Sequence, residues 1–142
     1  MIAIFILLVI NIFILYTTIE PREFTEVKEK YRILREHLRE TNNEKFSMLV
    51  KPIVLTGRKT MQESVGYNVN KGAEITICLN GGVNEIFHVL IHELAHSTVQ
   101  EYSHSEQFWS NYAELRDICI NIGLYEKITE KTEFCGQHVQ DK

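Results

Sequence analysis

The sequence predicts an α+β domain in which a short antiparallel sheet packs on a central helix and two further helices, preceded by an apolar N-terminal helix. Three observations predict this class. An uncharged apolar run opens the chain, several segments repeat apolar residues at the helical period, and a stretch near the middle alternates apolar and polar side chains. With 142 residues, 44% of them hydrophobic, the chain is expected to form one compact core.

The first segment, Ile2–Ile19, contains no charged residue. Its 18 residues would extend roughly 27 Å as a helix, close to the ~30 Å hydrocarbon core, so residues 2–19 are predicted to cross a membrane as a single-pass helix. A cleaved signal peptide is the alternative, but no Lys or Arg precedes the run and no clear small-residue cleavage site follows it. We therefore divide the chain into a membrane anchor, residues 1–20, and a folded domain, residues 22–142.

The flanking charges predict the orientation of this anchor. Basic residues follow the apolar run and none precedes it: Arg22, Lys28, Lys30, Arg32 and Arg35. The positive-inside rule then places the folded domain in the cytosol. Cys78, Cys119 and Cys135 match no disulfide framework, which favours a reducing compartment. The net charge of -4 gives no overall electrostatic reason to expect nucleic-acid binding.

An amphipathic helix is predicted after Pro21 and through Glu40, because apolar residues recur there every three or four positions among charged ones. Its apolar stripe consists of Phe24, Val27, Tyr31, Leu34 and Leu38. The charged side chains are interpreted as a solvated face. A functional basic stripe of Arg32, Arg35 and Arg39 is the alternative.

Three strands are predicted next. Phe46–Leu55 has β-branched character and is placed at a sheet edge, because Pro52 cannot donate to a central ladder. Val65–Val69 and Ala73–Leu79 are predicted to form a hairpin around Asn70–Gly72, with one face of the second strand buried.

A second helix is predicted from Asn84, a candidate N-cap, to about Gln100. It contains an HExxH motif, His92-Glu93-Leu94-Ala95-His96, in an apolar setting. Residues four apart share a helix face, so His92 and His96 can converge on one zinc ion. Glu93 can then take a proton from zinc-bound water, as this motif does in metalloproteases. The alternative is a chance occurrence, but burying these groups without a partner would be costly.

A catalytic zinc site takes a third protein ligand. His88 would lie about 12 Å along the helix axis from His96, too far for two ligands of one ion. Glu101 and Glu106 remain candidates, although each is also explained as an ordinary surface residue. His104 follows a turn from which the chain can fold back over the metal, and we favour it.

A third helix is predicted to begin at Ser105, a candidate cap, and to end at Gly123. Its apolar stripe consists of Phe108, Tyr112, Leu115, Cys119 and Ile122. We expect this helix to pack beneath the metal helix. In the polar tail, Cys135 and His138 supply only two of the four ligands of a structural zinc, so packing of Phe134 and Cys135 against the core is preferred.

Three sequence blocks together resemble the WLM family of Wss-like metalloproteases, which is related to the SprT and Spartan group. The blocks are SVGYNVNKGAEITICLN from Ser64, HVLIHELAHS from His88 and HSEQFW from His104. The resemblance implies a small zincin-like (minigluzincin) fold with His92, His96 and His104 as zinc ligands and Glu93 as general base. The loop Ser97–Ser103 is two residues longer than the family usually has.

The resemblance further implies hydrolysis of peptide bonds in protein substrates, typically proteins trapped on DNA or carrying ubiquitin-like modifiers. Protein and DNA are thus the implied partners, and a monomer is expected. The compact form with a leader resembles versions encoded by some large DNA viruses. We expect the strand Ala73–Leu79 to lie beside the metal and to align an extended substrate by backbone pairing. The predicted substrate-binding residues are Glu74, Ile75, Thr76 and Ile77. Tyr67 and Tyr102 are candidate oxyanion donors.

Two other functions remain open. The YgjP-like group shares the HELAH and HSxxFW signature but is linked to nucleotide pyrophosphate hydrolysis. That activity would need a basic phosphate pocket, for which the region around the motif offers little beyond Lys71. A membrane-anchored zinc-binding module without turnover is the third hypothesis.

Overall fold

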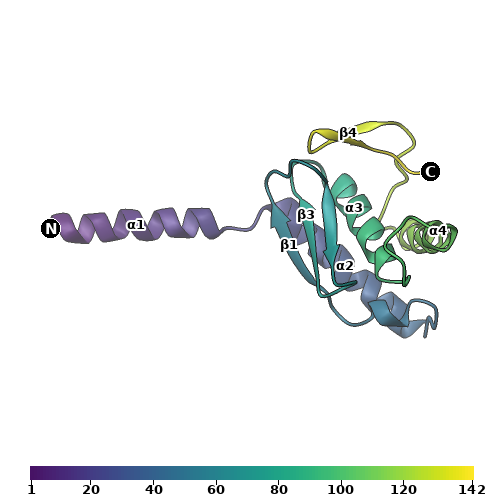
Figure 1. Ribbon diagram of the computed structural model, residues 1–142. Helices are drawn as coiled ribbons and strands as arrows, with labels where there is room; N and C mark the ends of the chain where they lie inside the picture. The colour runs from purple at the N-terminus through teal and green to yellow at the C-terminus, as the bar shows by residue number, and fades with distance from the viewer.

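The computed structural model describes residues 1–142 as an α+β domain preceded by a separate helix (Figure 1). The elements are α1 (Ile2–Thr18), α2 (Arg22–Glu40), the 3-10 helix η1 (Ser47–Leu49), β1 (Val54–Arg58), β2 (Gly66–Val69), β3 (Glu74–Cys78), α3 (Val83–His96), α4 (Glu106–Asn121), β4 (Thr132–Phe134) and β5 (Gln137–Val139). Helix α3 lies between the sheet and α4, and the β4–β5 hairpin lies beyond one end of α3 (Figure 1).

The main sheet has the strand order β1-β3-β2. β3 pairs antiparallel with β2, which confirms the predicted hairpin, and parallel with β1 on its other edge. The sheet is therefore mixed, whereas the sequence predicted an antiparallel one. The hairpin turns through Asn70, Lys71 and Gly72, which all have positive φ.

The edge strand predicted at Phe46–Leu55 is largely wrong in position. The first half of that segment forms η1, with Phe46 and Leu49 buried in the core, and the strand begins only at Val54. The apolar residues that suggested a strand thus enter the core from a 3-10 helix and the residue before it. β1 does lie at an edge of the sheet, as predicted.

Helix α2 buries the predicted apolar stripe: Phe24, Val27, Tyr31, Leu34 and Leu38. It runs behind the sheet and packs against α3 (Figure 1). The Tyr31 hydroxyl accepts a hydrogen bond from the Ile53 N–H at 3.0 Å, which fixes the chain just before β1. On the outer face, Arg32 pairs with Glu29 and Glu36 at 2.7 and 2.6 Å, as expected for a solvated charged surface.

Helix α1 has no buried residue and extends away from the domain (Figure 1). No single helix of the chain is both long enough and apolar enough to cross a membrane, and α1 itself has 17 residues. The bent pair of α1 and α2, which meet at 46°, reaches the required length and composition together. The single-pass helix predicted at residues 2–19 is not supported.

The tail contains a β4–β5 hairpin and a disulfide bond that the sequence did not predict. Cys135, in the hairpin turn, is bonded to Cys78 at the end of β3. The Phe134 ring packs on Gly81, where an added Cβ would lie 2.3 Å from a ring carbon. The interpretation that the three cysteines match no disulfide framework is therefore wrong for Cys78 and Cys135, because the bond joins residues 57 positions apart that only the folded chain brings together. Cys119 is free and buried.

Candidate metal centre

The helix that carries the HExxH motif is shorter than predicted. α3 begins after Gly82, because the side chain of Asn84 instead binds the backbone N–H and carbonyl of Glu126, at 3.0 and 2.7 Å. It ends at His96, and Ser97 N–H bonds back to the Leu94 carbonyl. This early end leaves a loop of nine residues before α4, in which the third histidine lies.

The fold brings His92, His96 and His104 together. The His104 Nε2 atom lies 3.0 Å from Nε2 of His92 and 3.1 Å from Nε2 of His96. Ligand nitrogens around one tetrahedral ion, each bound at about 2.0–2.1 Å, lie about 3.3 Å apart. The three nitrogens therefore have the spacing expected around a single metal ion, and together the residues form a candidate metal site.

The other candidate ligands lie outside this cluster. The Nδ1 atom of His88 is 2.9 Å from the Tyr125 hydroxyl, so this ring belongs to a separate network. Glu101 accepts a hydrogen bond from the Ser105 hydroxyl, and Glu106 begins helix α4.

Aromatic rings from α4 hold the imidazoles in place. Phe108 is fully buried, and its ring centroid lies 5.0 Å from that of His92 and 4.4 Å from that of His96. The Trp109 ring is 5.4 Å from the His104 ring. Ser105 caps α4 by accepting the Phe108 N–H, as predicted, which sets the position of both rings. The HSEQFW block thus supplies one candidate ligand, a helix cap and two packing rings.

Burial controls the charge state of the site. Burial and, next, the neighbouring imidazoles lower the pKa of His92 to about 3, and the same causes, with Lys71, lower the pKa of His96 to about 4. Both rings are therefore neutral at pH 7, the form that binds metals. Burial raises the pKa of Glu93 to about 7, a value suited to both accepting and returning a proton near neutral pH.

Two cavities meet at the histidines and form one cleft. The first, of about 290 Å³, extends toward Tyr67, Lys71 and Tyr102, and the second, of about 380 Å³, extends toward the β4–β5 hairpin. Residues common to both are Gly66, His92, Glu93 and His104. Both tyrosines predicted as oxyanion donors thus line the first cavity, with Tyr102 76% exposed and Tyr67 39% exposed.

The strand beside the cleft is β2 and not β3. Both edges of β3 are paired, and Ile75, Thr76 and Ile77 are almost completely buried. The predicted alignment of a substrate along Glu74–Ile77 therefore does not fit, because no backbone edge is free there. β2 has an unpaired outer edge and lines the cleft through its first residues. Local patterns predicted both strands but not their order in the sheet.

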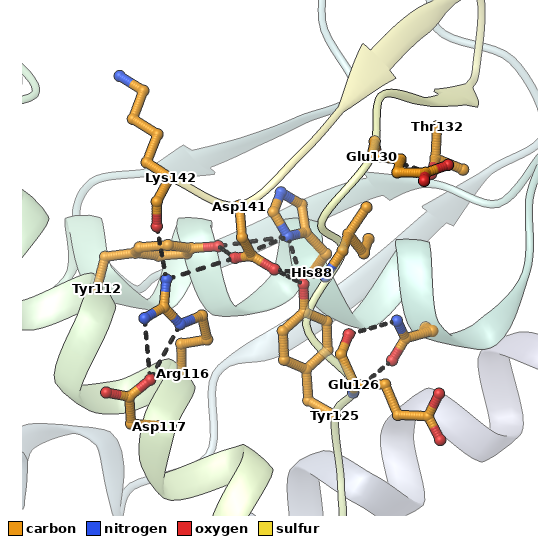
Figure 2. A network of polar contacts seen from close by, with 12 residues as sticks. His88, Tyr112, Arg116, Asp117, Tyr125, Glu126, Glu130, Thr132, Asp141 and Lys142 are labelled. Carbon is orange, nitrogen blue, oxygen red and sulfur yellow. Dashed lines mark hydrogen bonds and ion pairs between the residues drawn. The ribbon is translucent and has the colours of Figure 1, made fainter.

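A buried polar network, shown in Figure 2, joins the tail to the back of α3 and α4. The Asp141 carboxylate accepts hydrogen bonds from the hydroxyls of Tyr112 and Tyr125 and, at 2.8 Å, from the Ile128 N–H. The Tyr125 hydroxyl also contacts His88, one turn from the metal site. Sequence reasoning missed Asp141, because nothing distinguishes this residue from other polar residues of the tail.

Comparisons with known proteins agree with the sequence blocks. Residues 55–142 match the WLM domain family. An uncharacterized protein of Acanthamoeba polyphaga mimivirus is 28% identical over 129 residues, which cover 78% of this chain and 66% of that protein, just under two thirds of its length. Two solved structures are similar, each at 24% identity. The metallopeptidase zymogen abylysin of Pyrococcus abyssi has a TM-score of 0.43, with 68% of this chain and 97% of that chain covered. Wss1 of Saccharomyces cerevisiae has a TM-score of 0.42, with 49% and 62% covered.

Proposed function

The chain belongs to the WLM domain family, and from this premise we propose that it is a zinc-dependent metallopeptidase that hydrolyses peptide bonds of protein substrates. The observation that carries the proposal is the spacing of three imidazole nitrogens beside a buried carboxylate. His92, His96 and His104 would hold the ion, and Glu93, which is 6% exposed, lies in the same cleft.

The residues around the cleft have distinct roles in this mechanism. When bound, zinc lowers the pKa of water and polarises the substrate carbonyl. Glu93 accepts a proton from the attacking water and returns it to the leaving amine, which its raised pKa favours. The outer edge of β2 pairs with an extended substrate backbone. Tyr67 and Tyr102, which line the cavity, are the candidate donors to the developing oxyanion.

The scarcity of free cations around the cleft favours a peptide over a nucleotide as substrate. A phosphate pocket needs donors that are free to bind it, and Lys71 is the only Lys or Arg among the residues that line the two cavities. Its ammonium group already donates to the carbonyls of Val99 and Glu101. Pyrophosphate hydrolysis therefore has little support.

We also propose that α1 attaches the domain to a membrane. All its apolar side chains are exposed, and the side chains of Asn11, Thr17 and Thr18 bond to backbone carbonyls of the same helix, as in the hydrogen bond from the Asn11 amide to the Leu7 carbonyl. The Cys78–Cys135 disulfide favours a location of the domain on the oxidising side of that membrane, because cytosolic reductants keep thiols reduced. This proposed placement differs from the cytosolic one that the flanking charges predict. Co-flotation of the chain with phosphatidylcholine vesicles tests the attachment. The wild type should float with the vesicles and a Phe13→Arg variant should not. A wild-type chain that does not float with the vesicles would refute the attachment.

The activity is tested on the full 142-residue chain in detergent. Bound zinc is measured, and an unfolded reporter protein is incubated with the chain, with and without single-stranded DNA. Glu93→Gln should keep the zinc and lose about a hundredfold or more of the cleavage rate. Glu130→Gln, which changes an exposed carboxylate before β4, is the matched control and should cleave normally.

Three outcomes separate the hypotheses. Cleavage that requires DNA would extend the proposal to proteins trapped on DNA, and cleavage of a ubiquitin-fused reporter alone would extend it to modified substrates. Equal activity of the wild type and Glu93→Gln, or a wild type without zinc, would refute the peptidase. Nucleotide hydrolysis without proteolysis would support the YgjP-like activity instead.

A further inference from the structure

Lys71 connects the β2–β3 turn to the loop that carries His104. Its Nζ atom donates to the Val99 carbonyl at 2.9 Å and to the Glu101 carbonyl at 2.5 Å. The ring of Tyr102 covers the same ammonium group, with the ring centroid 4.3 Å from Nζ. One side chain thus binds three neighbouring residues of the loop just before the third histidine.

The far end of this loop is fixed separately. The Ser105 hydroxyl donates to the Glu101 carboxylate and accepts the Phe108 N–H, so the loop ends in the cap of α4. His104 lies between these two anchoring points and is itself exposed. Since little of the loop is buried, its hydrogen bonds restrain the backbone that carries His104, whereas Trp109 contacts the ring itself.

The length of the loop makes such a restraint necessary. Seven residues, Ser97–Ser103, separate His96 from His104, and a loop of this length has many conformations to lose when its ligand is positioned. Hydrogen bonds from an ammonium group are charge-assisted and stronger than neutral ones. The two hydrogen bonds from Lys71 to the loop therefore offset part of the conformational entropy that is lost when the loop is ordered.

The backbone conformation at Lys71 costs stability for any residue with a side chain. Its φ is 51°, in the left-handed region where glycine is favoured and other residues lose stability. Asn68, in the same hairpin, contacts the helix that carries the HExxH motif. Its amide donates to the Glu93 carbonyl at 2.8 Å and to the Ser97 hydroxyl at 2.7 Å. The hairpin therefore contacts both the metal helix and the loop.

We propose that Lys71 is a positioning residue of the metal centre, which holds the loop so that His104 meets His92 and His96. The inference rests on the proposed function, in that the three histidines bind zinc. Lys71 itself touches neither the metal nor the substrate in this role. Its effect is exerted through the His104 ring.

The test measures zinc affinity by competition with a chelator, using the full chain in detergent. Lys71→Met keeps a long unbranched side chain at the same left-handed position but removes the donors, and it should weaken zinc binding about tenfold or more. Lys71→Gln should weaken it as well, and it serves if Lys71→Met does not fold. Lys127→Met, at an exposed position remote from the loop, should bind zinc as the wild type does.

A double-mutant cycle separates positioning from a general structural role. In a His104→Ala background, most of the effect of Lys71→Met on zinc affinity should disappear, because the ligand it positions is gone. The melting temperature of the metal-free protein should change little. Equal affinity of the wild type and both Lys71 variants, or an undiminished effect in the His104→Ala background, would overturn the inference alone. A wild-type chain that binds no zinc would overturn the proposed function as well.

Discussion

Removal of the Cys78–Cys135 disulfide should destabilise the domain strongly. The bond closes a loop of 57 residues, and the chain-entropy relation gives about 4 kcal/mol of stabilisation for a loop of that size. Since small domains are stable by only about 5–15 kcal/mol, this is a large fraction of the total. The perturbation is a Cys78→Ser, Cys135→Ser double variant.

Urea unfolding of the wild type and of this variant measures the effect. With a urea dependence of roughly 2 kcal/mol per molar, the midpoint should fall by about 2 M. Addition of a reductant should shift the wild type to a similar midpoint and leave the variant unchanged. The unfolded, non-reduced wild type should show one free thiol, that of Cys119. A shift below about 0.5 M, or three free thiols, would refute the reasoning.

Three further predictions follow from the site and the network behind it. Burial lowers the pKa of His88, and for Asp141 the hydrogen bonds it accepts outweigh burial and lower its pKa. Both folded-state values lie below the unfolded ones, so the stability that these groups contribute should be lost as pH drops, that of His88 below about 6.5 and that of Asp141 below about 4. The second loss should be smaller in Asp141→Asn, and a urea midpoint with the same pH dependence in the wild type and in this variant would contradict the prediction. Gly66→Ala would place a Cβ 2.6 Å from a Val89 methyl carbon, so β2 must shift and cleavage should fall by up to about a hundredfold at unchanged zinc content. Chelation of the metal should lower the melting temperature of the wild type and have little effect on His104→Ala, and an equal effect on both would exclude that ligand.

The parts of the fold that the sequence predicted are those set by neighbours along the chain. The apolar stripe of α2 is buried as predicted, because a period of 3.6 residues places those side chains on one face. The β2–β3 hairpin follows from alternation around a short turn. The same local rules let His92 and His96 be placed on one face of α3.

The features that escaped prediction depend on residues far apart in sequence. β3 is central because β1 adds to it in parallel, and no local pattern encodes that pairing. Helix α3 was extended too far because Val99 continues its apolar pattern, whereas the structure gives that segment to the loop held by Lys71. The disulfide and the Asp141 network form only when the tail folds back on the domain.

The short connection between α1 and the domain limits how far the cleft can lie from α1. Only Ile19, Glu20 and Pro21 separate the two helices, a distance of about 10 Å at full extension. The Glu20 carboxylate accepts from Lys28 at 2.5 Å and from the Thr25 hydroxyl at 3.0 Å, so part of this connection is bound to α2. The surface to which α1 is attached therefore determines which proteins are close enough to contact the cleft. With the proposed peptidase activity, the domain would meet nearby proteins at a high effective concentration and distant ones hardly at all.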